Sequence, residues 1–294
     1  MEIIEIVKER LSLFKNLYDT IRIVDPINKK AINYGQDNME TLIEPCYSLC
    51  KADGYCDNCT SMRAFLEKDT FVKMEVTGEK LYVIISSPVT IDNKVYIVEM
   101  IKDISQTGSI INNNKNINNV ENFIKEMNDA AIKDELTGIY NRRFINERLT
   151  IDINESISNN KPLCVIMADL DFFKAVNDNH GHVVGDWVLK DFARILSTSI
   201  RSNSDWVGRY GGEEFLIVLT NTNSTNAFKV IEKIRKLVEE KSFDYNDVKI
   251  KITASFGAYS IINREITIDE LINEADKNLY LAKSSGRNKT IINL

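Results

Sequence analysis

Two glycines and two glutamates in a row, at 211–214, separate two short runs of strand-forming residues, 206–210 and 215–219. Adjacent glycines between strands predict a tight hairpin turn, because such turns need positive φ. Their missing side chains also let a ligand approach the backbone closely. Neighbouring strand residues point to opposite faces, so only one of Glu213 and Glu214 is expected to face a site. The alternative is a surface hairpin with solvated acids.

A second acidic feature ends an apolar run. Residues 163–169 read as a buried strand that ends in Asp169, and Asp171 and Lys174 follow shortly after it. Mg²⁺ prefers oxygen ligands and is usually held by one or two carboxylates together with substrate phosphates. A strand-end acid and an acidic hairpin together therefore predict a divalent-metal site.

Five segments in order resemble the GGDEF family of diguanylate cyclases. The signature is 211–215, Gly-Gly-Glu-Glu-Phe, which is the GGEEF form. The other segments are 134–143, 169–178 together with 181–186, 253–257 and 275–288. The resemblance covers residues 134 to about 292. It implies a nucleotidyl-cyclase-like domain with a central sheet flanked by helices.

The resemblance also implies a role for each matching residue. Two Mg²⁺ (or Mn²⁺) ions per site would be held by Asp169, Glu213 and the carbonyl of Leu170. Catalytic residues would be Glu213, Lys174 and, as a supporting acid, Glu214. Guanine would be read by Asn177 and Asp186. The triphosphate would be bound by the backbone of Phe172 and Phe173 and by Lys174, Lys283 and Arg287. Asp171 is expected to be structural.

Several of these residues have plainer interpretations from the sequence alone. Asn177 would be a helix terminus, and Asp186 after a glycine would be an N-cap. Lys283 and Arg287 lie four residues apart, so on one helix they would share a face and could grip one phosphate chain. They could equally be ordinary charges at a helix C-terminus.

The implied reaction condenses two GTP molecules into cyclic di-GMP. Each subunit of a homodimer would bind one GTP, and each 3′-hydroxyl would attack the α-phosphate held by the other subunit. The alternative is a catalytically silent GGDEF domain that only binds GTP or cyclic di-GMP. The signature is complete and Asp169 and Lys174 are present, which favours the enzyme.

One segment departs from the family pattern. The family's product-inhibition site is Arg-x-x-Asp, six residues before the signature. Here Asp205 is in place, but Ser202 stands where the arginine belongs. The neighbouring Arg201 is expected to point to a different side of the chain. Because the arginine is missing, we expect weak or absent product inhibition through this site.

The N-terminal half alternates in the manner of an antiparallel sheet. A hairpin is predicted over 21–34, strands over 71–76, 80–88 and 94–101, short helices between the second and third strands, and an opening helix over 2–18. This order, with its Asp-Ile-Ser ending, resembles a PAS sensor domain over 20–105; an unrelated small α+β domain is the alternative. The whole chain is thus predicted to be α+β, with a sensor at 1–105 for an unknown signal ligand, a linker at 106–133 and the GGDEF domain at 134–294.

Further elements are predicted from periodicity. Helices are expected over 141–158, 183–201, 224–240 and 268–285, and strands over 248–261 and 290–292. The linker begins with an asparagine-rich stretch that cannot build a core. The helix after it, from Val120 to Ala131, is expected either to pair with its copy in a dimer or to pack on its own chain.

Four of the five cysteines lie close together, at Cys46, Cys50, Cys56 and Cys59. Their spacing, C-x3-C-x5-C-x2-C, could surround one zinc ion or an iron–sulfur cluster. The alternative is four ordinary thiols or a reversible disulfide.

Charge and hydropathy limit the remaining possibilities. The formal net charge is −6, which argues against a nucleic-acid binder because such proteins need a basic face. No apolar run approaches the ~18 residues of a membrane span. The charges in the first ten residues are unlike a signal peptide, so we expect a cytoplasmic protein with no membrane partner.

Overall fold

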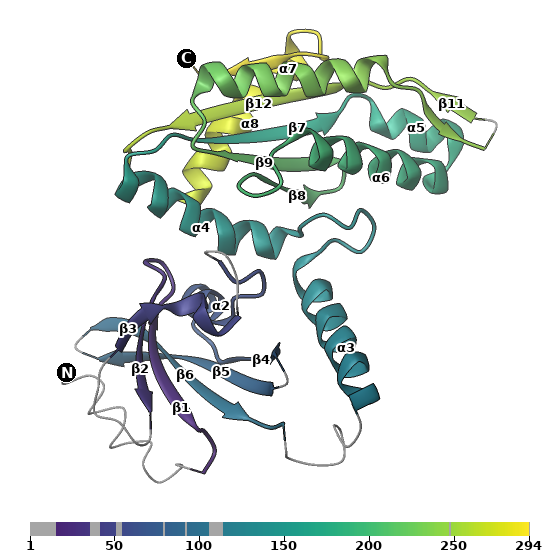
Figure 1. Ribbon diagram of the computed structural model, residues 1–294. Helices are drawn as coiled ribbons and strands as arrows, with labels where there is room; N and C mark the ends of the chain where they lie inside the picture. The colour runs from purple at the N-terminus through teal and green to yellow at the C-terminus, as the bar shows by residue number, and fades with distance from the viewer. Residues whose placement is uncertain are drawn as a thin grey trace. The chain divides into compact units, whose positions relative to one another are not determined.

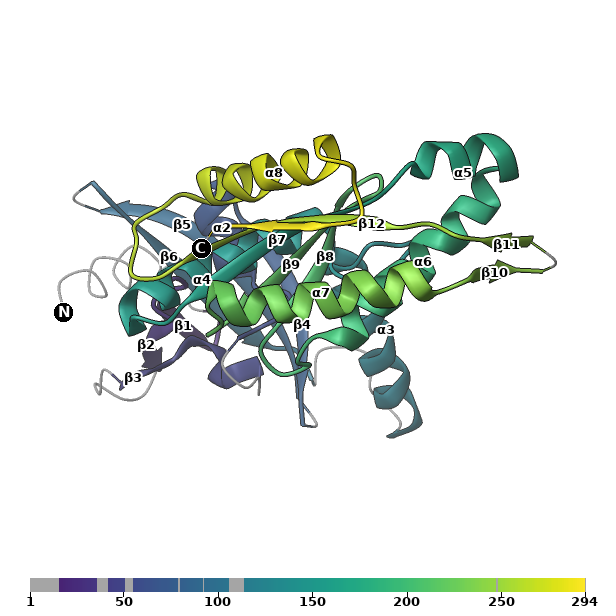
Figure 2. The same ribbon diagram turned by 90° about the horizontal axis from the view of Figure 1, so that it is seen from above.

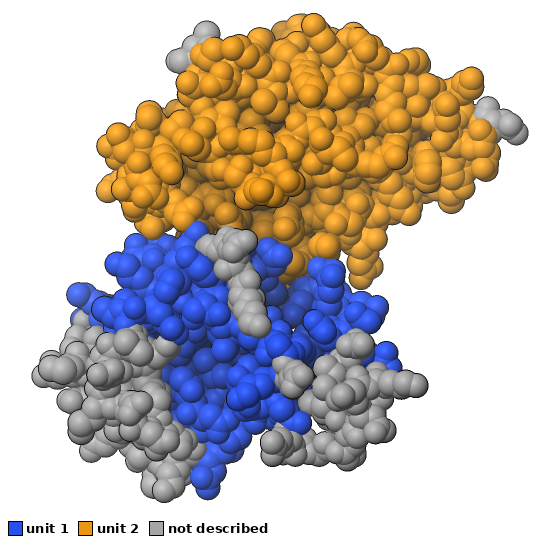
Figure 3. Space-filling model, viewed as in Figure 1, with its two compact units in different colours: residues 1–131 blue, residues 132–294 orange. Residues whose placement is uncertain are grey.

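The computed structural model describes residues 16–35, 42–50, 55–78, 80–91, 93–105, 114–246 and 248–293. The chain divides into two compact units, residues 1–131 and 132–294 (Figure 3). The predicted opening helix falls almost entirely outside the described residues. The asparagine-rich stretch was expected to precede the linker helix, but the helix begins within it, at Asn114 rather than Val120.

The first unit is built on one antiparallel sheet of six strands in the order β3-β2-β1-β6-β5-β4 (Figure 1). The strands are β1 Thr20–Asp25, β2 Lys30–Gly35, β3 Leu42–Pro45, β4 Phe71–Thr77, β5 Lys80–Ile91 and β6 Lys94–Asp103. The predicted hairpin and the three later strands are confirmed. The short edge strand β3 was not predicted. The helices expected directly after the second strand follow β3 instead.

Three helices accompany this sheet: η2 Cys46–Cys50, α2 Thr60–Glu67 and α3 Asn114–Ile132. A buried polar cluster joins α2 to the sheet. Arg22 of β1 donates from Nε to Oε2 of Glu99 on β6 over 2.8 Å, and Ser61 of α2 donates to the other Glu99 oxygen. Buried charges are stable only when paired in this way.

The second unit is a five-stranded sheet in the order β13-β12-β7-β9-β8. The strands are β7 Leu163–Leu170, β8 Trp206–Gly211, β9 Glu214–Thr220, β12 Ala254–Ile261 and β13 Thr290–Ile292. Every pair is antiparallel except β12 with β13. The helices are α4 Arg142–Asn159, α5 Phe173–His180, α6 His182–Ser199, α7 Ser224–Glu240 and α8 Ile268–Ser284. Figure 2 shows α7 and α8 on opposite sides of this sheet.

The predicted strand over 248–261 is wrong as a single element. The structure breaks it into β11 Val248–Ile250 and β12, which belong to different sheets. β11 pairs only with β10 Phe243–Tyr245 in a small separate hairpin. The run is apolar enough for one strand. However, its first part pairs with β10 and its last part with β7, so the strand is interrupted at residues 251–253, and the sequence does not reveal these pairings.

Strand β7 is buried along its whole length and has two different faces. Cys164, Ile166, Ala168 and Leu170 contribute to the large core shared with α6 and α7. Side chains alternate along a strand, so Met167 and Asp169 point to the other face, which α8 covers. This alternation directs the strand-end acid toward α8.

Gly257 of β12 is where α8 packs closest to the sheet. A Cβ built there would lie 1.9 Å from the backbone nitrogen of Leu279 and 2.4 Å from the backbone oxygen of Ala275. Gly257→Ala should therefore lower the free energy of unfolding by about 3 kcal/mol. Denaturant unfolding measures this. Gly211→Ala is the control, because no atom lies within 4 Å of its added Cβ; equal stability of the two variants would contradict the prediction.

Candidate active site

The strand-end acid Asp169 lies at the centre of an acidic edge of the sheet. In the register it stands opposite Glu214 of β9 on one side and Ser255 of β12 on the other. Directly opposed residues of antiparallel strands share a face, so the Asp169 and Glu214 carboxylates lie on the α8 side together. Asp169 is only 4% exposed.

The signature hairpin differs in detail from the prediction. Gly211 is the last residue of β8, and the two turn residues are Gly212, with φ of +51°, and Glu213. The pair of glycines therefore does not form the turn by itself. Arg209 fixes the turn, because its Nε donates to the backbone oxygen of Gly212 over 2.9 Å and its Nη1 lies 3.1 Å from Asp134 Oδ1.

Burial and like charges dominate the electrostatics of this edge. The pKa of Asp169 is raised to about 6, mainly by burial and also by the charges of Glu213 and Glu214, against the lowering effect of Lys283. Lys283 Nζ lies 2.7 Å from Asp169 Oδ2. Burial also raises the pKa of Glu214. Excess negative charge that is poorly hydrated favours the binding of cations here.

The donor set at this edge fits Mg²⁺. Asp169, Glu213 and the carbonyl of Leu170 offer only hard oxygen atoms, and they are few, as expected for an ion that keeps waters and shares substrate phosphates. Within the described ranges, no group of three or more His, Cys, Asp or Glu side chains could hold a metal ion by itself. A bound triphosphate would have to supply the missing oxygen ligands.

The packing of α5 against α6 places the amide of Asn177 against Gly185, the residue before Asp186. A Cβ on Gly185 would lie 1.9 Å from Oδ1 of Asn177, so only a glycine leaves room for that amide. Neither residue is a helix cap: Asn177 lies inside α5, and Asp186 is in the second turn of α6. The capping interpretation is therefore wrong.

The N-terminus of α5 lies between Asp169 and these polar residues in the sequence. Phe172 is its N-cap, with φ of +58°, and its ring is 67% exposed. Lys174 is exposed in the first turn. Free backbone N–H groups at such a helix start favour anions. The guanidinium carbon of Arg287 lies 4.3 Å from the centre of the Phe172 ring.

The shared helix face expected for Lys283 and Arg287 is wrong. Helix α8 ends at Ser284, and Arg287 has φ of +61°, outside the helix. The two cations reach the site separately: Lys283 contacts Asp169, and Arg287 stacks on Phe172. Gly286, with φ of +113°, breaks the helix between them.

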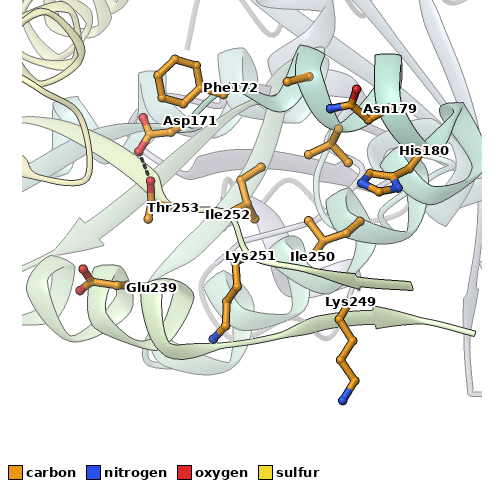
Figure 4. A pocket seen from close by; sticks show the side chains of 12 residues that line it. Asp171, Phe172, Asn179, His180, Glu239, Lys249, Ile250, Lys251, Ile252 and Thr253 are labelled. Carbon is orange, nitrogen blue, oxygen red and sulfur yellow. Dashed lines mark hydrogen bonds between the residues drawn. The ribbon is translucent and has the colours of Figure 1, made fainter. Parts of the chain in front are cut away.

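Asp171 is held by the fold, in agreement with its expected structural role. Its carboxylate accepts hydrogen bonds from the hydroxyls of Thr253 and Ser255, both over 2.6 Å, and from the backbone N–H of Asn288 over 3.0 Å. Figure 4 shows the bond to Thr253. Beside it lies a cavity of about 390 Å³ between α5 and residues 249–253. The side chains of Lys249 and Lys251 point away from this cavity (Figure 4).

The side chain of Arg201 reaches Asp205, although it was expected to point to a different side of the chain. Its guanidinium donates to both oxygens of Asp205, over 2.7 and 2.6 Å. The two residues are four apart in the loop after α6, and the backbone N–H of Asp205 donates to the carbonyl of Arg201 over 3.1 Å, a turn that brings the two side chains together. Asp205 is buried and also accepts from the backbone N–H of Thr220.

The cysteine cluster gains no support as a metal centre from the part of the chain that the structure describes. Cys46, Cys56 and Cys59 are not among any potential metal-binding group found there. The side chain of Cys50 lies outside the described residues. Burial raises the pKa of Cys59 to about 12, and its sulfur caps α2 by accepting from the N–H of Met62 over 3.4 Å.

Comparison with known proteins identifies the second unit. Its sheet and acidic edge are those of a nucleotide cyclase-like domain. The family model described as "Diguanylate cyclase, GGDEF domain" matches residues 131–289. The match spans more than half of the chain, which therefore belongs to the GGDEF family. It does not reach residues 20–105, so the PAS-like assignment stays a prediction.

Two curated relatives carry the same domain. Diguanylate cyclase A of Treponema denticola is 43% identical over 140 residues, which are 48% of this chain and 38% of that protein. Response regulator PleD of Caulobacter vibrioides is 34% identical over 165 residues, 55% of this chain and 36% of that protein. The chain thus spans little more than a third of the length of these relatives.

Solved structures agree with the fold. Diguanylate cyclase SiaD of Pseudomonas aeruginosa, solved with its activator SiaC, is 36% identical with a TM-score of 0.54, covering 60% of this chain and 68% of that one. The GGDEF domain of DgcB from Caulobacter crescentus, solved with c-di-GMP, is 27% identical with a TM-score of 0.52, covering 55% and 93%. The predicted α+β architecture is confirmed.

The described helices include none that is long and apolar enough to cross a membrane.

Proposed function

We propose that this chain is a diguanylate cyclase that condenses two GTP molecules into cyclic di-GMP and two pyrophosphates. The observation that carries the proposal is the acidic edge where Asp169, Glu214 and Lys283 meet, with the signature turn beside them. A silent binding module would not need this concentration of carboxylates around the buried Asp169. Diguanylate cyclase A of Treponema denticola and the SiaD structure are both named for this activity.

Each residue has a task in this reaction. Asp169, Glu213 and the carbonyl of Leu170 would hold Mg²⁺, which supplies charge stabilisation to the reacting phosphates. Asn177 and Asp186 would bind the guanine edge, because an amide and a carboxylate together match its donors and acceptor. The α5 backbone at Phe172 and Phe173, with Lys174, Lys283 and Arg287, would bind the triphosphate and oppose the charge that develops on it. Glu214 would support the site through its own carboxylate.

The reaction joins two bound nucleotides, so it requires two copies of the domain. The 3′-oxygen of one GTP forms a bond to the α-phosphorus of the other, the bond from that phosphorus to the pyrophosphate breaks, and the 3′-hydroxyl proton leaves. The same step in the opposite direction closes the ring. A homodimer therefore forms the complete site, and its formation is the natural point of control for residues 1–105. We propose that these residues are a PAS-like sensor, that residues 106–133 are its linker, and that the protein acts in the cytoplasm.

A direct assay tests the proposed activity. The purified full chain is incubated with GTP and Mg²⁺ at concentrations high enough for dimers, and the products are separated by chromatography. Cyclic di-GMP and pyrophosphate in a ratio of about one to two support the proposal. GTP binding without any cyclic product would instead identify a silent module.

Product inhibition should be weak in this chain. Ser202 offers no cation, and Asp205 is already paired with Arg201 in the structure. Added cyclic di-GMP should therefore change the initial rate less than about twofold at micromolar concentration. Rate measurements with product added test this. Strong noncompetitive inhibition that Asp205→Ala removes would contradict it and would show that Arg201 replaces the missing arginine.

A further inference from the structure

The loop after α8 carries Arg287 in an unusual backbone conformation. Three residues in a row have positive φ: Gly286 at +113°, Arg287 at +61° and Asn288 at +44°. Only glycine adopts such angles without strain, so the two others need contacts that hold them in place. The contacts made by Asn288 meet that need.

Asn288 is held from three directions. Its backbone N–H donates to Oδ2 of the buried Asp171 over 3.0 Å. Its side-chain amide donates to Oε1 of Glu239 over 2.7 Å, and its side-chain oxygen accepts from Nη1 of Arg235 over 2.8 Å. Arg235 and Glu239 also pair with each other over 3.0 Å on α7. The Asn288 amide, Arg235 and Glu239 thus each contact the other two.

These contacts tie two segments that are far apart in sequence. Asp171 precedes Phe172, whose positive φ starts α5, and Asn288 follows Arg287, which stacks on the Phe172 ring. The ring contact and the hydrogen bond from Asn288 to Asp171 therefore join the same two loops at adjacent positions. Together they set where the Arg287 guanidinium lies relative to the N-terminus of α5.

We propose that Asn288 is a positioning residue, which holds Arg287 where it binds the β- and γ-phosphates of GTP. This deepens the proposed function and rests on it. Arg287 has a long flexible side chain, and a displacement of about 1 Å at such a group is enough to weaken its action strongly. The guanine contacts at Asn177 and Asp186 come from other elements, so Asn288 should not affect them.

The test compares two ligands that share the base but not the phosphates. The probes are α,β-methylene-GTP with Mg²⁺, which is not cleaved at the reacting bond, and GMP, which lacks the β- and γ-phosphates. Binding to the full chain is measured by calorimetry. Asn288→Gly keeps the positive φ and removes only the amide, so we expect the Kd of the GTP analogue to rise about 10-fold while that of GMP changes less than about twofold.

A double-mutant cycle tests whether Asn288 acts through Arg287. Arg287→Ala should weaken analogue binding, and adding Asn288→Gly should weaken it no further, because the group to be positioned is gone. Asn293→Gly is the matched control. Its side chain also makes two hydrogen bonds, both with the backbone of Ser260, over 2.8 and 3.2 Å. These bonds lie outside the loop that carries Arg287, so both Kd values should stay unchanged.

The outcomes separate this inference from the activity on which it rests. If wild-type protein binds the analogue but Asn288→Gly binds it equally well, the positioning role is overturned and the cyclase proposal stands. Equal weakening of both ligands, or full additivity with Arg287→Ala, also overturns it, since either result indicates a general structural effect. Failure of the wild-type chain to bind the analogue would overturn the cyclase proposal itself.

Discussion

Glu213→Gln should lower the rate of cyclic di-GMP formation by at least about 100-fold while the fold survives. Glu213 occupies the second position of the signature turn, beside the buried Asp169, whose pKa its charge raises. The amide keeps the size of the side chain but removes a charged oxygen ligand for Mg²⁺. Because Glu213 lies in a turn rather than in the core, little stability depends on it.

Initial rates at saturating GTP over a range of Mg²⁺ concentrations measure this effect. Glu265→Gln is the control, because it makes the same chemical change at an exposed position outside the site. The far-ultraviolet circular dichroism of both variants should match that of the wild type. Turnover within about threefold of wild type in Glu213→Gln would remove this residue from the metal site.

Most elements of the second unit were predictable because they have strong local signals, whereas the short elements α5 and β10 were not predicted. The apolar run that ends in Asp169 and the glycines of the signature define β7, β8 and β9, and the structure has them within one or two residues. Helices α7 and α8 have periodic apolar faces and were predicted almost to the residue. Local pattern was sufficient here because tertiary packing agrees with it.

Errors arose where a residue's position depends on distant partners. Arg287 was placed on a helix because its spacing from Lys283 is helical, but Gly286 ends the helix first. Arg201 was expected to point to a different side of the chain from position 202, but its side chain reaches Asp205, because sequence spacing alone does not give side-chain direction in a loop. The strand over 248–261 was divided because β10 gives its first part a different partner.

For some residues of the site, the sequence contains a local indication of their role that the predictions did not include. Arg209 lies two residues before the signature, where its guanidinium can donate to the backbone of the turn; it is bonded to Gly212 and Asp134. Asn288 follows a glycine after a helix, where asparagine is favoured because it tolerates positive φ. Its partners Arg235 and Glu239 lie more than 45 residues earlier, so no local pattern could have indicated them.

Asp169→Asn should abolish cyclase activity and yet stabilise the metal-free protein at neutral pH. The pKa of Asp169 is about 6 in the folded chain, against 3.8 for the unperturbed group. The folded state therefore holds this proton over a range of pH where the unfolded chain has lost it. Stability falls as pH rises from about 4 to about 6 and stays lower above that range. The ionised carboxylate thus destabilises the fold in the absence of a bound cation.

An asparagine removes this penalty because it remains neutral. The shift of about two pH units corresponds to about 3 kcal/mol, but Lys283 loses its partner, so the expected gain at pH 7.5 is about 1–2 kcal/mol. Lys283 is one-third exposed and can regain water. Denaturant unfolding with EDTA at pH 7.5 and pH 4.5 measures the gain, which should be smaller at the lower pH, where folded wild-type Asp169 is mostly protonated and only part of the penalty remains. A variant less stable than wild type at pH 7.5 would show that the ion pair with Lys283 outweighs the burial of the charge.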